Sequence, residues 1–136
     1  MVNEKQSTSP YVGLSSRDVF GLTILEVAEN NQQIVALTAD LTDSVKLKEF
    51  EKRYPDRFFN FGVAEQNMMG AAAGLTLAGK IPFACTYAIF ASLRAAEQMR
   101  TDVAYNDLPV KIVSSHGGIS FDVAGATHHA IEDIGI

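Results

Sequence analysis

The residue best suited to acid–base chemistry is a carboxylate at the start of a long uncharged segment. Glu65 follows a short aromatic stretch and Gly62, and residues 66–79 contain no charged side chain. A helix that is apolar all round is normally buried, so a carboxyl group at its start is costly to ionise unless another group stabilises the charge. Glu65 is therefore our candidate for proton transfer. The alternative is that it only complements the helix dipole.

The three histidines of the chain lie close to one glycine-rich loop: His116, His128 and His129. A lone histidine is more often structural than catalytic, but three beside one loop favour a catalytic role, because imidazoles exchange protons near neutral pH. Two of them stand at the spacing of metal ligands on a helix, in the pairs His128–Glu132 and His129–Asp133. Because two pairs on adjacent helix faces cannot converge on one ion, we predict no metal site in this chain.

Composition and charge limit the class of protein. The chain has 136 residues, of which 47% are hydrophobic, and can bury one core. The net charge is −5 and the basic residues between 46 and 53 alternate with acidic ones, which argues against a nucleic-acid-binding surface. A single cysteine, Cys85, excludes an internal disulfide framework and indicates a reducing compartment. The chain has no apolar run of membrane-spanning length, and its first ten residues lack a signal-peptide core, so we expect a cytoplasmic protein with no membrane contact.

The elements that must position these residues alternate along the chain. Residues 1–13 are predicted to form a flexible N-terminal arm, and residues 14–136 one domain. Ser15 or Ser16 can cap the first helix. Apolar spacing predicts helices at residues 16–30, 44–53, 66–79, 90–105 and from about 128, and strands at 33–39, 57–60, 81–86 and 110–114. This alternation predicts an α/β fold, a three-layer sandwich with a mostly parallel sheet and helices on both faces.

Ligands of such sheets bind beyond the carboxyl ends of the strands. Six candidate residues lie at or just after predicted strand ends: Asp40, Glu65, Tyr87, Phe90, His116 and His128. We therefore expect these side chains to gather along one edge of the sheet. The alternative for the two aromatic residues is that they belong to the core.

The sequence around Glu65 carries a family resemblance. Residues 61–67 read Phe-Gly-Val-Ala-Glu-Gln-Asn and resemble the strand-to-helix turn of the pyrimidine-binding domain in the transketolase family of thiamine diphosphate enzymes. The resemblance extends from about Ser15 to the end of the chain. It implies that thiamine diphosphate is the cofactor and that Glu65 hydrogen-bonds its aminopyrimidine ring. A carboxyl in a dry pocket has a raised pKa and can pass a proton to a ring nitrogen.

The segment after the third predicted strand resembles the aromatic wall of that family. Tyr87 and Phe90 match positions whose rings pack on the aminopyrimidine. Leu93 stands where transketolases often place another aromatic residue, which implies a wider pocket on that side. Arg94 and Arg100 can pair with nearby surface carboxylates, an interpretation that we favour for Arg100.

Residues 38–44 resemble the strand end that reads alanine-aspartate-leucine-threonine in transketolases. The resemblance implies that Asp40 and Leu41 approach the cofactor, with Leu41 helping to bend it, and that Ser44 lies near the phosphate end of a sugar substrate. The alternative is that Asp40 caps a turn and Ser44 caps a helix. For Ser44 both can hold, because a helix N-terminus is also an anion site.

The glycine-rich loop resembles the donor-side loop of the family through residues 125–133. The match implies that His116 faces the phosphate end of the sugar and that His128 assists proton transfer at the substrate oxygens. Ala124 stands where the family has an aspartate, and Asp122 is displaced from that position. This difference weakens the expected recognition of the donor hydroxyl.

One family motif is missing from the chain. Thiamine diphosphate enzymes hold the diphosphate and its Mg²⁺ or Ca²⁺ ion with a Gly-Asp-Gly motif, and no such tripeptide occurs here. The chain also ends before the family's third domain. We therefore expect a fragment or one subunit of a split enzyme, inactive alone, that joins a diphosphate-binding subunit or domain in a homodimer or heterotetramer. The small residues of the 66–79 helix suit an interface.

The resemblance implies a transferase that moves a two-carbon ketol unit between sugar phosphates, as in pentose phosphate metabolism. Related alternatives are a deoxyxylulose-phosphate synthase and the beta subunit of a 2-oxoacid dehydrogenase. An alternative of another class is a noncatalytic α/β module that only dimerises. Thiamine diphosphate binding separates the enzymes from the module.

Overall fold

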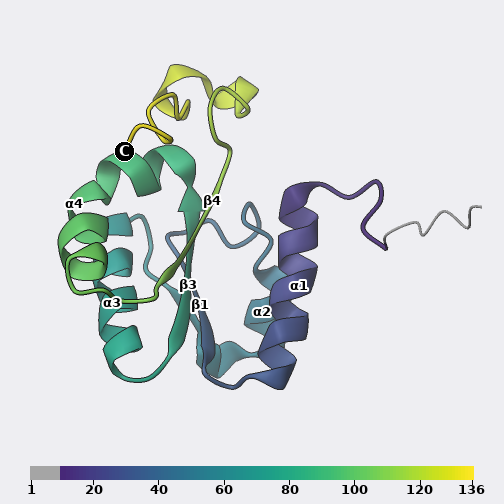
Figure 1. The fold of residues 1–136 in the computed structure, drawn as a ribbon. Coiled ribbons are helices and arrows are strands. Elements are labelled where there is room, and N and C mark those ends of the chain that lie inside the picture. Colours follow the sequence, from purple (N-terminus) through teal and green to yellow (C-terminus); the bar gives the residue numbers. More distant parts are fainter. Residues whose placement is uncertain (1–9) are drawn as a thin grey trace, which may run out of the picture.

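A four-stranded parallel sheet forms the centre of the structure, a computed structural model that describes residues 10–136. Its strands, in the spatial order β2-β1-β3-β4, are β1 (Ile34–Thr38), β2 (Phe58–Asn60), β3 (Ile81–Tyr87) and β4 (Lys111–Ser115). Every neighbouring pair is parallel. Figure 1 shows the sheet between two layers of helices, which confirms the predicted α/β sandwich. Most of the predicted arm (residues 1–13) lies outside the described residues, and the arm remains a prediction.

One face of the sheet is covered by α1 (Ser16–Asn30) and α2 (Lys48–Arg53) (Figure 1). Of the two predicted cap residues, Ser15 caps α1, because its hydroxyl oxygen accepts a hydrogen bond from the backbone N–H of Asp18 at 3.2 Å. Ile24 of α1 and Phe50 of α2 are buried in a common hydrophobic cluster against the sheet. This cluster fixes α1 close to β4 and to the loop after β1.

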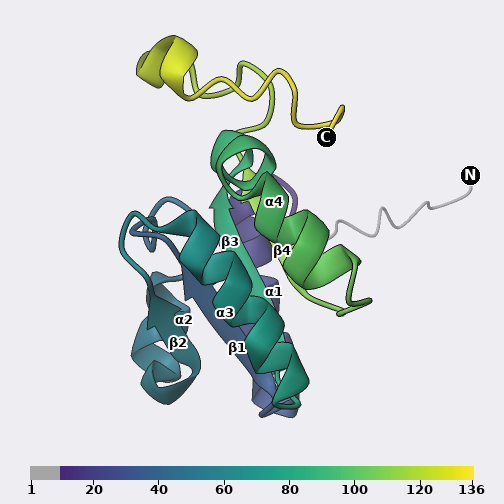
Figure 2. The same cartoon turned by 90° about the vertical axis from the view of Figure 1, so that its left-hand side faces the viewer.

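The other face is covered by α3 (Glu65–Leu77) and by the helical stretch after β3, which consists of η2 (Phe90–Arg94), α4 (Ala96–Gln98) and η3 (Met99–Ala104). Figure 2 shows α3 and α4 side by side on this face. Met68 and Met69 of α3 pack with Leu37 of β1 in a second buried cluster. Because both faces of β1 are covered, all five of its residues are buried, as is typical of parallel sheets. None of the helices in residues 10–136 is long and apolar enough to cross a membrane.

The polar helix predicted from residue 44 begins only at Lys48. Residues 42–46 form turns instead, and Lys46 adopts a φ of 61°, which an α-helix does not allow. Ser44 therefore does not cap this helix, and the cap position is occupied by Leu47 without a side-chain hydrogen bond. The short 3₁₀ helix η1 (Pro55–Arg57) follows α2.

The helix predicted from His128 is not formed. The 3₁₀ helix η4 (Asp122–Thr127) ends just before His128, and residues 131–135 form turns. Ala130 uses both of its backbone groups in an antiparallel bridge to Gly118, with N–O distances of 2.8 and 3.2 Å, and these groups are not available to a helix. Figure 1 shows this C-terminal segment beyond the carboxyl end of β4.

Candidate active site

Glu65 is the first residue of α3 and follows a tight turn that joins β2 to the helix. The side-chain oxygen of Asn60 holds this turn by accepting hydrogen bonds from the backbone N–H groups of Gly62 and Asp40, each at 3.0 Å. Gly62 has a φ of 66°, which glycine adopts without steric cost. The residue Glu65 is only 1% exposed. It therefore occupies the buried helix start that the sequence predicts.

The carboxylate of Glu65 forms an ion pair that the sequence did not indicate. The Nη1 group of Arg94 donates a hydrogen bond to Oε2 of Glu65 at 2.8 Å. The guanidinium carbon of Arg94 also lies 4.1 Å from the ring centroid of Phe90. The pairing predicted for Arg100 is confirmed, since its Nε lies 3.4 Å from Oε2 of Glu97.

Four of the predicted site residues form a cluster of rings at the carboxyl ends of β3 and β4. Tyr87, the last residue of β3, lies at the centre of this cluster and is 6% exposed. Its ring centroid is 4.6 Å from that of His116, 5.9 Å from Phe90 and 6.1 Å from His128. The rings of Phe90 and His128 are 5.3 Å apart. Since Phe90 also contacts Arg94, the ring cluster is continuous with the Glu65 ion pair.

A fifth ring was not predicted from the sequence. Phe121 comes from the glycine-rich loop, and its centroid lies 4.4 Å from His116, 5.0 Å from Tyr87 and 5.4 Å from His128. The only sequence signal for Phe121 was an aromatic residue in a loop of small and polar residues. Phe121 thus contacts both of the histidines that the resemblance assigned to the substrate.

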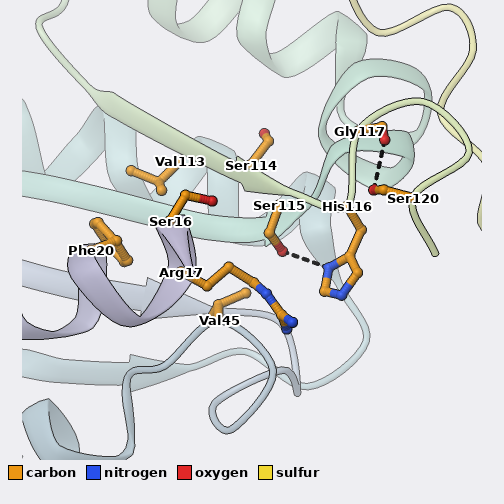
Figure 3. A pocket seen from close by; sticks show the side chains of 10 residues that line it. All are labelled: Ser16, Arg17, Phe20, Val45, Val113, Ser114, Ser115, His116, Gly117 and Ser120. Carbon is orange, nitrogen blue, oxygen red and sulfur yellow. Dashed lines mark hydrogen bonds between the residues drawn. The ribbon is translucent and has the colours of Figure 1, made fainter. Parts of the chain in front are cut away.

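A pocket of about 540 Å³ opens beside His116, between the start of α1 and the end of β4 (Figure 3). Arg17 of α1 points into it, toward the imidazole of His116, and donates a hydrogen bond to the carbonyl oxygen of Ser44 at 3.1 Å. A hydroxyl group lies beside the same imidazole, because Ser115 Oγ is 2.9 Å from Nδ1 of His116. Burial, and to a smaller extent the charge of Arg17, lower the pKa of His116. Arg17 was not among the site residues predicted from the sequence.

The close packing of α1 on the loop after β1 brings Arg17 to this place. A Cβ atom at Gly21 would lie 2.8 Å from both Cβ and the carbonyl oxygen of Lys46, so only glycine fits there. The exposed ion pair between Lys46 and Asp18, at 2.9 Å, joins the same two segments. Gly21 therefore sets the distance between Arg17 and the segment that carries Ser44.

The remaining predicted residues lie at the same sheet edge but outside the ring cluster. Asp40 follows β1, is exposed, has a φ of 60°, and its carboxylate forms no hydrogen bond or ion pair with the described residues. Leu41 is half-buried and packs on the hydrophobic cluster beneath α1 and α2. Ser44 is half-buried and contributes its carbonyl oxygen, not its hydroxyl, to the contact with Arg17.

The histidines of the loop have different surroundings. Nδ1 of His128 lies 2.9 Å from the hydroxyl of Thr127, whereas the buried Nε2 of His129 has no hydrogen-bond partner among residues 10–136. Within residues 10–136, no three His, Cys, Asp or Glu side chains form a group that could hold a metal ion. Of the three imidazoles, those of His116 and His128 join the ring cluster.

The chain is similar to known proteins in sequence and in fold. A family profile described as the pyrimidine binding domain of transketolase matches residues 12–136. The putative transketolase C-terminal section of Methanocaldococcus jannaschii is 49% identical over 120 residues, which cover 88% of this chain and 38% of that protein. One subunit of the apulose-4-phosphate transketolase of Actinobacillus succinogenes is 41% identical over 112 residues, or 82% of this chain and 36% of that protein. A 1-deoxy-D-xylulose-5-phosphate synthase of Mycolicibacterium gilvum is 42% identical over 117 residues, but only 18% of that protein is covered.

Two solved structures have the same fold. A split-gene transketolase, described as an inactive beta4 tetramer, is 50% identical and matches with a TM-score of 0.73 over 86% of this chain and 37% of that chain. The transketolase of Campylobacter jejuni, at 24% identity and a TM-score of 0.80 over 88% of this chain and 19% of that chain, shows the fold alone. This chain therefore spans less than two fifths of the length of the relatives it matches.

Proposed function

Because the chain belongs to the family of transketolase pyrimidine-binding domains, we propose that it is the pyrimidine-binding part of a transketolase-like enzyme that transfers a two-carbon ketol unit between sugar phosphates. The observation that carries this proposal is the continuous group formed by Glu65, Arg94, Phe90, Tyr87 and the two histidines at one edge of the sheet. A buried carboxylate, an aromatic surface and titratable imidazoles are the parts that proton transfer next to a bound ring requires.

The residues of this group fit the aminopyrimidine half of thiamine diphosphate. The carboxylate of Glu65 is buried and already accepts an N–H donor from a planar group that lies against the ring of Phe90. A planar aminopyrimidine presents the same flat face, and its ring nitrogen, once protonated, is an N–H donor of the same kind. When bound, thiamine diphosphate supplies an electron sink for cleaving the carbon–carbon bond beside a substrate carbonyl. Glu65 would hold a proton at the pyrimidine nitrogen, and Tyr87 with Phe90 would exclude water from that face. Asp40 and Leu41 remain proposed contacts of the cofactor.

The pocket beside His116 supports the assignment of a phosphorylated substrate. Arg17 brings a permanent positive charge to this pocket, and the pocket wall carries the hydroxyl groups of Ser115 and Ser120. Arginine and hydroxyl groups bind phosphate oxygens well. We assign the phosphate end of the sugar to Arg17 and His116, with Ser44 beside them. We propose that His128, whose ring also contacts Phe121, moves protons at the substrate oxygens.

The diphosphate and its Mg²⁺ or Ca²⁺ ion are assigned to a partner subunit. The relatives include one subunit of a transketolase and a transketolase C-terminal section, and both names imply a second part of the enzyme. We propose a heterotetramer with a diphosphate-binding subunit, and a cytoplasmic location suits its single buried cysteine. A deoxyxylulose-phosphate synthase is the second candidate function, because one such enzyme is 42% identical to this chain.

The test is a substitution in the assembled enzyme. Glu65→Gln removes the charge and the proton but keeps the size of the side chain, and we expect turnover of a ketose phosphate to fall by about 100-fold or more. Glu97→Gln is the matched control, because Glu97 is an exposed carboxylate paired with Arg100 on the same layer. Near wild-type turnover of the Glu65→Gln enzyme would contradict the proposal. So would a folded assembly that does not bind thiamine diphosphate in calorimetry, a result that favours the dimerisation module.

A further inference from the structure

The pair between Arg94 and Glu65 differs from the other ion pairs of residues 10–136. In the others both side chains are at least 38% exposed, whereas Glu65 is 1% exposed and Arg94 is 43% exposed. An unpaired buried carboxylate is strongly unfavourable, so Glu65 needs a positive or N–H-donating neighbour in the chain alone. Arg94 supplies this neighbour while one side of its own side chain faces solvent.

Arg94 makes two contacts at once, and both coincide with those assigned above to the cofactor ring. Its planar guanidinium donates to the Glu65 carboxylate at 2.8 Å and lies 4.1 Å from the centroid of Phe90. A flat ring that is hydrogen-bonded to Glu65 and stacked on Phe90 needs the same carboxylate and the same aromatic surface. The guanidinium and the ring therefore compete for this place.

We infer that Arg94 acts as a gate, occupying the aminopyrimidine place when no cofactor is bound and turning out to solvent when the ring enters. This inference rests on the proposed function, because it concerns the site assigned there to the cofactor. The position of Arg94 suits such movement. It is the last residue of η2, a π-helical turn of the kind that is frequent at functional sites, and its exposed side chain can leave without unfolding the helix.

The gate should lower the apparent affinity of the site for the aminopyrimidine ring. If the closed arrangement dominates, the apparent affinity for the ring is reduced by the fraction of molecules that are open. Because Arg94 is partly exposed, the closed arrangement is only moderately favoured, and we expect its removal to raise the affinity by about 3- to 10-fold. The same removal leaves Glu65 unpaired in the free chain, so the free chain should melt at a lower temperature.

The experiment measures binding rather than turnover. Thiamine diphosphate with Mg²⁺ is titrated by calorimetry into the enzyme assembled with its diphosphate-binding subunit, and 4-amino-2-methylpyrimidine is titrated into the chain alone and followed by NMR. Wild type, Arg94→Leu and Arg94→Lys are compared. Arg100→Leu is the matched control, since it makes the same exchange at the exposed ion pair between Arg100 of η3 and Glu97. The variant Glu65→Gln/Arg94→Leu has no unpaired charge, and it shows whether a lower melting temperature of Arg94→Leu comes from the unpaired carboxylate of Glu65.

We expect Arg94→Leu to bind both probes more tightly than wild type and Arg100→Leu to bind them as wild type does. We also expect the melting temperature to recover in the double variant. Arg94→Lys should fall between wild type and Arg94→Leu, because lysine keeps the charge and loses the flat stacking group. Equal or weaker binding by Arg94→Leu overturns the gate while leaving the proposed function intact. Failure of every variant, wild type included, to bind either probe overturns the proposed function and the gate together.

Discussion

The two ends of the candidate site differ in whether their charged side chain is paired with an opposite charge. At the α3 end, the carboxylate of Glu65 is buried and is matched by one cation, Arg94. At the α1 end, Arg17 forms no ion pair among the described residues and faces an open pocket beside His116 (Figure 3). Burial explains this difference, because a carboxylate removed from water needs a charged partner, whereas Arg17 is only half-buried and donates to a neutral carbonyl oxygen.

The comparison indicates which ligand group each end can accept. In the proposed gate, a ligand at the α3 end replaces Arg94, so it should be flat and should carry either an N–H donor or a basic ring nitrogen that shares a proton with Glu65. A ligand at the α1 end can bring its own negative charge, because no carboxylate of the described chain neutralises Arg17. Binding at the α1 end should also weaken as salt concentration rises, since the pocket is open to screening ions.

The largest expected effect that would sharpen this comparison is at the α1 end. Arg17→Leu removes the charge of the pocket, and we expect kcat/KM for a phosphorylated ketose to fall by about 10- to 100-fold, because a hydrogen bond to a charged group contributes about 1.5–3 kcal/mol. A donor without phosphate should lose little. The measurement is kcat/KM for both donors in the assembled enzyme.

Arg53→Leu is the control for Arg17→Leu, because Arg53 is an exposed arginine of α2 paired with Glu29. An equal loss for phosphorylated and unphosphorylated donors would show that Arg17 supports the fold and not the phosphate, and the contrast between the two ends would then fail.

A smaller effect is expected where the two ends meet. Phe121 contacts both His116 and His128 and so takes up space beside the two imidazoles. Phe121→Ala should open this space and raise the ratio of kcat/KM for a longer ketose phosphate over a shorter one by about 10-fold, the lower end of the range that a change of one methylene in an apolar pocket produces. Phe59→Ala, at a partly exposed phenylalanine of β2, is the control. An unchanged ratio would mean that Phe121 does not line the path of the substrate.

The smallest effect concerns the pH dependence of stability. The pKa of His116 is lowered in the folded chain from its ordinary value of 6.5, by burial first and by Arg17 second. As the pH falls below 6.5, the unfolded chain therefore takes up a proton at His116 before the folded chain does, and the free energy of unfolding decreases. His116→Asn should lose less stability than wild type between about pH 7.5 and about pH 5.5 in urea unfolding. A steeper or equal loss in the variant would contradict the assigned direction.

Most of the fold was predictable from the sequence because its signals are local. The serine before α1, the apolar runs of β1 and β3, and the uncharged segment that became α3 each determine an element through a cap or a burial pattern. The two errors, at Lys48 and after Thr127, occur where backbone groups are used by turns or by the Gly118–Ala130 bridge. A local pattern does not contain such long-range hydrogen bonds.

The candidate site was predictable in part for the same reason. The resemblance and the strand ends indicated Glu65, Tyr87, Phe90, His116 and His128, and the structure brings the rings among them together. The sequence did not assign three residues to the site: Arg94, Arg17 and Phe121. The local pattern around each of them is equally consistent with an ordinary surface or loop side chain. Their roles depend on partners elsewhere in the chain.

The sequence by itself determined the layered α/β architecture and the place of a single acid at the start of a buried helix. Only the tertiary structure decided which cation neutralises that acid, which arginine enters the pocket beside His116 and which loop ring contacts both histidines. The physical reason is that burial and capping are properties of short segments, whereas the distance between two side chains depends on how helices and strands pack together.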